Sequence, residues 1–248
     1  GEWGGCMGKM SQEMGAHGWY APGMNTHRTA FGARNYEYFS EDGVLAGNIG
    51  ASAVAGAMNQ GVYSYIKHFA LYEGNGKMVS VWSNEQAIRE IYLKPFEISV
   101  KKGGANAVMV SWSFLGHKWT GENSSLLNTV LRDEWGFRGM ALTDFFRNNG
   151  HGFMNADAAL ANGVDAMLST FDGPENNVAD RSHPTSVKQM RNACKNVMYT
   201  VVSSWAYDGG GTSVGMETWK KAAIGLDVVL VLGLAAVEII VIKGSGQR

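Results

Sequence analysis

The sequence predicts an α/β fold built on a parallel sheet, and the (β/α) barrel is the closed form that such a sheet favours. Apolar strand-like runs alternate with helix-like segments along residues 1–206, which is the pattern of repeated strand–helix–strand units. The 33 glycines of the chain supply permissive backbone for the turns between them. Five strands can be counted, whereas a closed barrel of this kind has eight. They are expected at 18–24, 62–70, 105–113, 139–144 and 164–169.

The first helices follow from capping residues and apolar spacing. Residues 7–17 have helical character, although two glycines weaken it. Ser40 can cap a helix that runs through Asn59, with two carboxylates close to its positive end. Ser83 opens a third helix of about two dozen residues with a capping pattern.

A helix and a strand between Ser124 and Phe146 carry the first candidate for chemistry. Ser124 or Ser125 can cap the helix, and Gly136 ends it. A short apolar strand follows and leaves Asp144 at its C-terminal end. The loops at that end of a parallel sheet form the face where ligands bind, so Asp144 is placed for chemistry. An aspartate at this position can also simply cap the next helix.

Two helices complete this part of the chain. A short one is expected from Asn155 to Asn162, and a long one from Thr185 to about Ser204. Residues 1–206 are therefore predicted to form one domain, followed by a glycine-rich linker over residues 207–218.

The C-terminal segment has the length of a membrane span. Residues 219–243 include 21 consecutive mostly apolar residues, enough for a helix that crosses a bilayer, and 244–248 form a short tail. Asp227 and Glu238 oppose this interpretation, but both lie nearer the ends than the middle, where a carboxylate costs less. The alternative is a buried terminal helix of a soluble domain. We predict a single transmembrane helix.

Five stretches, in this order, resemble glycoside hydrolase family 3 over roughly residues 10–204. They are Ala21–Arg28, Arg34–Asp42, Ile66–Ala70, Ser83–Glu97 and Leu131–Asp144. The resemblance implies a TIM-type barrel whose first strands precede the Ala21 stretch and are missing from this sequence. It also implies a β-glucosidase-like enzyme that hydrolyses terminal β-linked sugars by a retaining, two-step mechanism; a β-xylosidase of the same family is the alternative.

The resemblance also implies the site residues. Asp144 would be the nucleophile, and Arg34, Lys67 and His68 would hydrogen-bond the sugar in the subsite where cleavage occurs. A cation beside the nucleophile favours its ionised form. Trp112 stands where many relatives have a tyrosine, and an indole can stack on a sugar but has no phenolic hydroxyl. Without the resemblance, a surface ion pair for Lys67 and a core position for His68 are the simpler interpretations.

Two features depart from the family pattern. The stretch 70–77 lacks the usual Gln-Glu pair and arginine, and Glu73 is left as an undecided substitute for the lost carboxylate. The acid/base of the family usually lies on an α/β sandwich domain, which no segment of this chain resembles. Some relatives place that domain before the barrel and end in a membrane helix, so we expect it upstream of Gly1. A non-catalytic, membrane-anchored sugar-binding remnant is the alternative function.

The composition of the chain limits the classes of binding partner that we expect. Charged residues make up 17% of the chain and the net charge is −1, whereas a nucleic-acid partner would need a basic stripe. The six histidines show no metal-ligand spacing, so we expect neither metal nor cofactor. The predicted partners are a β-glycoside or oligosaccharide substrate and a membrane, with the catalytic part outside the cytoplasm.

Overall fold

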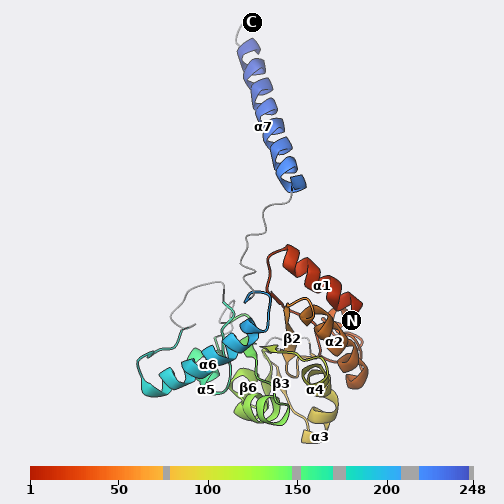
Figure 1. Ribbon diagram of the computed structural model, residues 1–248, viewed down its shortest axis with the longest axis vertical. Coiled ribbons are helices and arrows are strands. Elements are labelled where there is room, and N and C mark those ends of the chain that lie inside the picture. Colours follow the sequence, from red (N-terminus) through yellow and green to blue (C-terminus); the bar gives the residue numbers. More distant parts are fainter. Residues whose placement is uncertain (75–78, 147–151, 170–176, 208–217, 246–248) are drawn as a thin grey trace. The chain divides into compact units, whose positions relative to one another are not determined.

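The computed structural model describes residues 1–74, 79–146, 152–169, 177–207 and 218–245 (Figure 1). The chain divides into two compact units, Gly1–Gly210 and Gly211–Arg248. The first unit is an α/β domain, and the described part of the second is one long helix.

The elements of the first unit alternate between helices and strands, with η marking short 3₁₀ or π-helical segments. In chain order they are α1 (Glu2–Glu13), β1 (Gly18–Trp19), η1 (Asn35–Glu37), α2 (Gly43–Met58), β2 (Tyr63–Phe69), β3 (Ser80–Val81), α3 (Glu85–Ala87), η2 (Ile88–Tyr92), α4 (Lys94–Lys101), β4 (Ala107–Val110), β5 (Phe114–Leu115), β6 (Lys118–Trp119), η3 (Thr120–Glu122), η4 (Ser125–Glu134), β7 (Met140–Thr143), α5 (Ala156–Ala161) and α6 (Pro184–Val202).

The main sheet is parallel, as the sequence predicts, with strand order β1-β2-β4-β7. The strand expected at 164–169 is reduced to one parallel bridge between Ala166 and Leu142 on β7. Backbone hydrogen bonds still join the segment to β7, such as those from the Thr143 amide to the Ala166 carbonyl at 3.0 Å and from the Phe146 amide to the Leu168 carbonyl at 2.6 Å. Side-chain bonds add to them. Asp165 accepts hydrogen bonds from the Ala141 amide at 2.7 Å and from Arg132 at 2.7 Å. All five predicted strands thus contribute to one sheet, although most are shorter than expected.

A second, three-stranded sheet was not predicted. Its order is β3-β5-β6, and β5 and β6 form an antiparallel hairpin. Gly116, in the turn of this hairpin, has a φ of 62°, a conformation that glycine adopts without strain. The hairpin follows β4 directly, so it lies at the C-terminal end of the main sheet.

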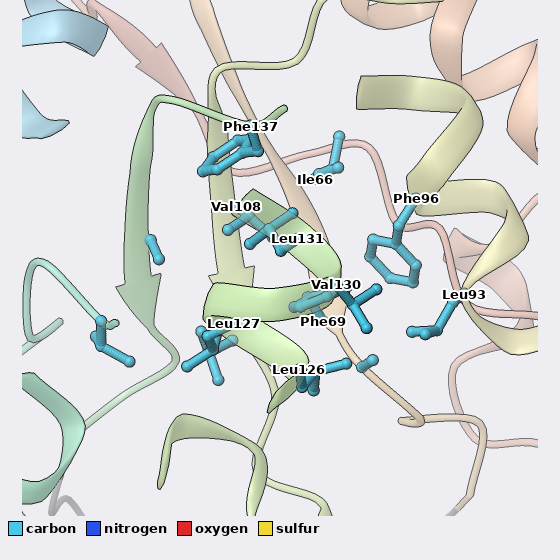
Figure 2. Close-up of a cluster of buried hydrophobic side chains, with 14 of the residues drawn as sticks. Ile66, Phe69, Leu93, Phe96, Val108, Leu126, Leu127, Val130, Leu131 and Phe137 are labelled. Carbon is cyan, nitrogen blue, oxygen red and sulfur yellow. The ribbon is translucent and has the colours of Figure 1, made fainter. Parts of the chain in front are cut away.

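The hydrophobic core joins the main sheet to the helices packed on it. Figure 2 shows side chains of β2, β4, α4 and η4 directed into one cluster. Phe69, Phe96 and Leu127 are completely buried in it. Burial of each such side chain stabilises the fold by about 2 kcal/mol relative to an exposed position. The core thereby fixes the C-terminal ends of the strands, where the candidate residues lie.

Several predicted helices begin, end or are capped at different residues from those expected. Asp42, not Ser40, caps α2, because its carboxylate accepts hydrogen bonds from the Val44 and Leu45 amides at 2.7 and 3.2 Å. The long helix expected from Ser83 divides into α3, η2 and α4, and the break before α4 lies at Pro95, which cannot continue an unbroken helix.

Neither Ser124 nor Ser125 caps η4 as predicted. Asn123 supplies the capping oxygen instead, accepting from the Leu126 amide at 3.1 Å. Gly136 does end η4, with a φ of 74°.

α1 begins earlier than the predicted 7–17, because its glycines face α2 rather than solvent. A Cβ atom on Gly4 would lie 2.0 Å from the Ala53 carbonyl oxygen, and one on Gly56 would lie 2.2 Å from the Gly1 carbonyl oxygen. The two helix backbones are therefore in direct contact. Glycine weakens an isolated helix but permits this approach.

The second unit contains α7, Thr218–Ser245. Its segment Lys221–Ile239 has a mean hydropathy of 2.2 and is long and apolar enough to cross a membrane, by length and composition alone.

Replacement of the α2 cap tests this part of the fold. Asp42→Ala removes the oxygen that accepts from two amides, and we expect it to lower the free energy of unfolding by about 1 kcal/mol. Asp42→Asn keeps an acceptor oxygen and should retain most of that stability. Urea unfolding of the three proteins measures the difference, and equal losses in both variants would contradict the capping role.

Candidate active site

An irregularity at the end of β2 brings two adjacent polar side chains into the candidate site. Lys67 pairs with Met109 and Phe69 pairs with Val110, so His68 is an extra residue in the ladder. Neighbouring side chains of a regular strand point to opposite faces, and a bulge changes that direction. Both Lys67 and His68 consequently contact side chains of the candidate site: Lys67 lies beside Glu37, and His68 lies beside Tyr38 and Asp144.

Asp144 follows β7 directly, at the carboxyl edge of the sheet. Its amide donates to the Val110 carbonyl at 3.1 Å, which continues the ladder by one residue. Its Oδ1 accepts from the Phe145 amide at 2.8 Å, and its Oδ2 lies 3.8 Å from His68 Nε2. Asp144 does not cap the next helix, because Asn155 caps α5. The Asp144 carboxylate is therefore directed at His68.

Two cations share one carboxylate beside this edge. Arg34 Nε donates to Glu37 Oε1, and Lys67 Nζ lies 3.4 Å from Glu37 Oε2. Burial, the largest single effect, acts to lower the pKa of Arg34, but the bond to Glu37 and the electrostatic effects of Tyr38, Glu37 and Tyr72 together raise the pKa. Glu37 thus holds both cations in place, and their side chains remain partly exposed.

Aromatic rings link the cations to the segment after Asp144. The Arg34 guanidinium lies 5.5 Å from the centroid of the Tyr72 ring, close enough for a cation–π interaction. The Tyr72 ring is 6.2 Å from Trp112, whose indole N–H donates to the Phe145 carbonyl at 3.2 Å. Trp112 therefore lies beside the residue that follows Asp144, as an aromatic surface next to the carboxylate.

His68 is buried and uncharged. Burial is the main cause that lowers its pKa well below the usual value, and the nearby charges of Arg34 and Lys67 lower it further. The imidazole thus acts as a neutral hydrogen-bonding group beside Arg34 and Lys67.

Glu73 points inward rather than toward the open edge. Its Oε1 accepts hydrogen bonds from Asn25 Nδ2 at 3.3 Å and from the Thr26 amide at 3.5 Å. Burial raises the pKa of Glu73 to about 7, against the opposing effect of these bonds. The carboxyl group that the sequence left undecided therefore joins the site to the segment around Asn25.

The structure brings together all five residues singled out in the sequence: Arg34, Lys67, His68, Trp112 and Asp144. Sequence reasoning missed Glu37, Tyr38 and Tyr72. The sequence spacing could have revealed Glu37, because it lies three residues after Arg34 and faces it across one turn of η1. Nothing in the sequence marked Tyr72, since it lies in the stretch that departs from the family pattern.

No three histidine, cysteine or carboxylate side chains gather as a metal site in the part of the chain that the structure describes.

The comparison with known proteins decides the family. The model of the domain described as Glycosyl hydrolase family 3 N terminal domain matches residues 2–197. The chain belongs to glycosyl hydrolase family 3. The resemblance seen in the sequence is thereby confirmed, and the matched region begins slightly earlier than expected.

Relatives within family 3 agree in sequence and in fold. A beta-glucosidase of Rhizobium radiobacter is 41% identical over 143 residues, which are 57% of this chain and 18% of that protein. The structure of beta-glucosidase 3B from Thermotoga neapolitana in complex with glucose matches with a TM-score of 0.74 and 32% identity, covering 90% of this chain and 32% of that one. A Bifidobacterium adolescentis GH3 beta-glucosidase matches with a TM-score of 0.76 at 27% identity, covering 85% of this chain and 31% of that one.

The family 3 chain therefore spans a third or less of the length of these relatives.

Glu73 predicts a pH dependence of stability. Its pKa is raised on folding, so the native state binds the proton more tightly than the unfolded state does. Its contribution to stability is present at acidic pH and is lost as the pH rises from about 4.5 to about 7. The loss is about 3 kcal/mol.

Glu73→Gln cannot titrate, so its stability relative to wild type should increase over this pH range. Urea unfolding at several pH values measures the difference. Glu90→Gln changes an exposed carboxylate and should show no such trend. A constant difference between Glu73→Gln and wild type would contradict the raised pKa.

Proposed function

We propose that this chain carries the nucleophile and part of the sugar-binding subsite of a retaining β-glucosidase, with Asp144 as nucleophile. The observation that supports this most is the position of Asp144 at the carboxyl edge of a parallel sheet, 3.8 Å from His68 and beside the Arg34–Glu37–Lys67 group. Its family 3 relatives named beta-glucosidases support the substrate class.

The reaction would proceed in two steps. Asp144 attacks the anomeric carbon, the bond to the leaving oxygen breaks, and a covalent glycosyl ester forms with inverted configuration. Water then attacks the same carbon, the ester bond breaks, and the second inversion restores the β-configuration. Arg34, Lys67 and His68 would hold sugar hydroxyls, and Trp112 would offer a ring face to the sugar.

The general acid/base is proposed to come from a domain outside this chain. Two other carboxyl groups lie in the described cluster. Glu37 is paired with Arg34 and Lys67, and Glu73 is bonded to Asn25 and Thr26. Neither is free to protonate a leaving group at the open edge. An α/β sandwich preceding the barrel is the arrangement that we favour.

The α/β unit is proposed to be part of an eight-stranded barrel, with its first strands supplied by a segment outside residues 1–248. Its parallel strand order and its match to family 3 structures support this proposal. α7 is proposed to be a single membrane span that holds the catalytic part outside the cytoplasm, supported by the length and hydropathy of Lys221–Ile239.

The anomeric configuration of an azide product tests the role of Asp144. A 2,4-dinitrophenyl β-glucoside needs no acid, because its leaving group departs without a proton. With azide present, the wild-type chain should release β-glucosyl azide by two inversions at the anomeric carbon. Asp144→Ala should release the α-azide by a single direct inversion. NMR of the products distinguishes the two anomers.

Asp133→Ala, which removes an exposed carboxylate at the end of η4, serves as the matched control and should give the β-azide. The same anomer from Asp144→Ala and wild type would contradict the assignment. No azide product from the wild-type chain, together with measurable glucose binding, would favour a non-catalytic sugar-binding protein.

The membrane proposal is tested by fractionation. We expect the full chain, expressed in cells, to remain with membranes after alkaline carbonate extraction. Leu230→Arg places a charge at the middle of the apolar segment, disfavours insertion by about 3 kcal/mol and should release the protein. Leu230→Val is the control. Extraction of the wild-type protein into the soluble fraction would contradict the proposal.

A further inference from the structure

The extra residue in β2 is hydrogen-bonded through its backbone to a side chain. Lys67 and Phe69 pair with consecutive residues of β4, so the register passes over His68. A residue inserted by a bulge is left out of the pairing, yet its buried N–H and C=O groups still need partners. The Asn25 carboxamide supplies both. Its Nδ2 donates to the His68 carbonyl at 3.1 Å, and its Oδ1 accepts from the His68 amide at 2.8 Å.

Asn25 continues a backbone ladder on the β1 side of β2. The Lys67 amide donates to the Pro22 carbonyl at 3.1 Å, and the Met24 amide donates to the Lys67 carbonyl at 2.6 Å. Parallel pairing on this side therefore reaches Lys67, through its bridge with Gly23. At the next residue, two atoms of one side chain bond the strand as the N–H and C=O of a neighbouring strand would.

The Asn25 carboxamide has one orientation that satisfies its neighbours. The residue is completely buried. A backbone N–H only donates and a carbonyl only accepts, so Oδ1 must face the His68 amide and Nδ2 the His68 carbonyl. Glu73 favours the same orientation, because its Oε1 accepts from Asn25 Nδ2 at 3.3 Å. Asn25 is therefore held by three hydrogen bonds in a single arrangement.

The directions of two candidate sugar-binding side chains depend on this arrangement. A regular β2 would turn Lys67 and His68 to opposite faces of the sheet. If the carboxamide were absent, the bulge would leave the His68 N–H and C=O buried and unpaired, which destabilises it. Regular pairing with β4 would avoid that cost. Asn25 thus stabilises the bulged form of β2 relative to the regular form.

We propose that Asn25 is a positioning residue of the candidate site, which holds the bulge at His68 and thereby directs Lys67 and His68 toward the sugar. It acts through the backbone of His68. Its effect on sugar binding rests on the proposed function, whereas its hold on the bulge does not.

Hydrogen exchange of the His68 backbone amide measures the hold on the bulge. NMR of the ¹⁵N-labelled full chain follows this amide together with that of Asp144, which donates to the Val110 carbonyl at 3.1 Å in the next ladder. Asn25→Ala removes the carboxamide, and Asn25→Leu removes it but fills a similar volume. In both variants we expect the His68 amide to exchange about five- to tenfold faster, the effect of one lost hydrogen bond. The Asp144 amide should exchange at the wild-type rate.

Asn128→Leu is the matched control, because it removes a carboxamide of η4 that donates to the Asn162 carbonyl at 3.1 Å. It should leave exchange at His68 unchanged. A wild-type rate for His68 in Asn25→Leu would mean that Asn25 only fills space, and would overturn the proposal. Faster exchange at His68 and Asp144 alike, or loss of the folded state in both Asn25 variants, would also overturn it, because Asn25 would then stabilise the domain as a whole.

Labelling of Asp144 by 2,4-dinitrophenyl 2-deoxy-2-fluoro-β-glucoside tests the consequence for the sugar. Displaced Lys67 and His68 side chains would bind the sugar more weakly, whereas Asp144 keeps its place after β7. Both Asn25 variants should therefore need about tenfold more reagent for half-maximal labelling, with a smaller change in the limiting rate. Asn128→Leu should match the wild type.

The outcomes separate the two proposals. Half-maximal labelling at the wild-type concentration, together with faster exchange at His68, would contradict the positioning role of Asn25. A wild-type chain that is not labelled at Asp144 would remove the proposed nucleophile, and the exchange rates would still decide whether Asn25 holds the bulge.

Discussion

The candidate site depends on the single extra residue in the ladder between β2 and β4. A regular strand would direct Lys67 and His68 to opposite faces of the sheet. Because the register shifts between Lys67 and Phe69, both polar side chains reach the cluster at the carboxyl edge. Asp144 arrives at the same edge from β7 by ordinary parallel pairing. One irregular and one regular strand end therefore supply the two sides of the site.

Ion pairing and burial together set the electrostatics of the candidate site. Arg34 and Lys67 are cations, and Glu37 is the anion that pairs with both. His68 is kept neutral by burial and by these cations, and Glu73 shares its region as a carboxyl group with a raised pKa. Pairing with Glu37 lets the two cations remain partly buried at the site.

The parallel sheet and the placement of Asp144 at its edge were predicted from topology, whereas the resemblance to family 3 implied the roles of Arg34, Lys67, His68 and Trp112. The carboxyl ends of neighbouring parallel strands must meet at one edge, whatever the details of packing. The sequence could not predict the β5–β6 hairpin, whose strands are only two residues long. Nor could it reveal Tyr38 and Tyr72, since their roles depend on which rings and carbonyls lie within reach in three dimensions. The expected cap Ser40 failed for a similar reason, as Asp42 nearby offers a better-placed oxygen.

The contact between α1 and α2 has a consequence for how this protein tolerates sequence change. Carbonyl oxygens occupy the space that a methyl group on Gly4 or Gly56 would need, so the two helices can approach this closely only with glycine at both positions. In a saturation library, these two sites would behave as forbidden positions, although ordinary helix preferences would recommend alanine at each. A substitution at either glycine, whether random or designed to strengthen the helix, would then separate α1 from α2 instead of stabilising the domain.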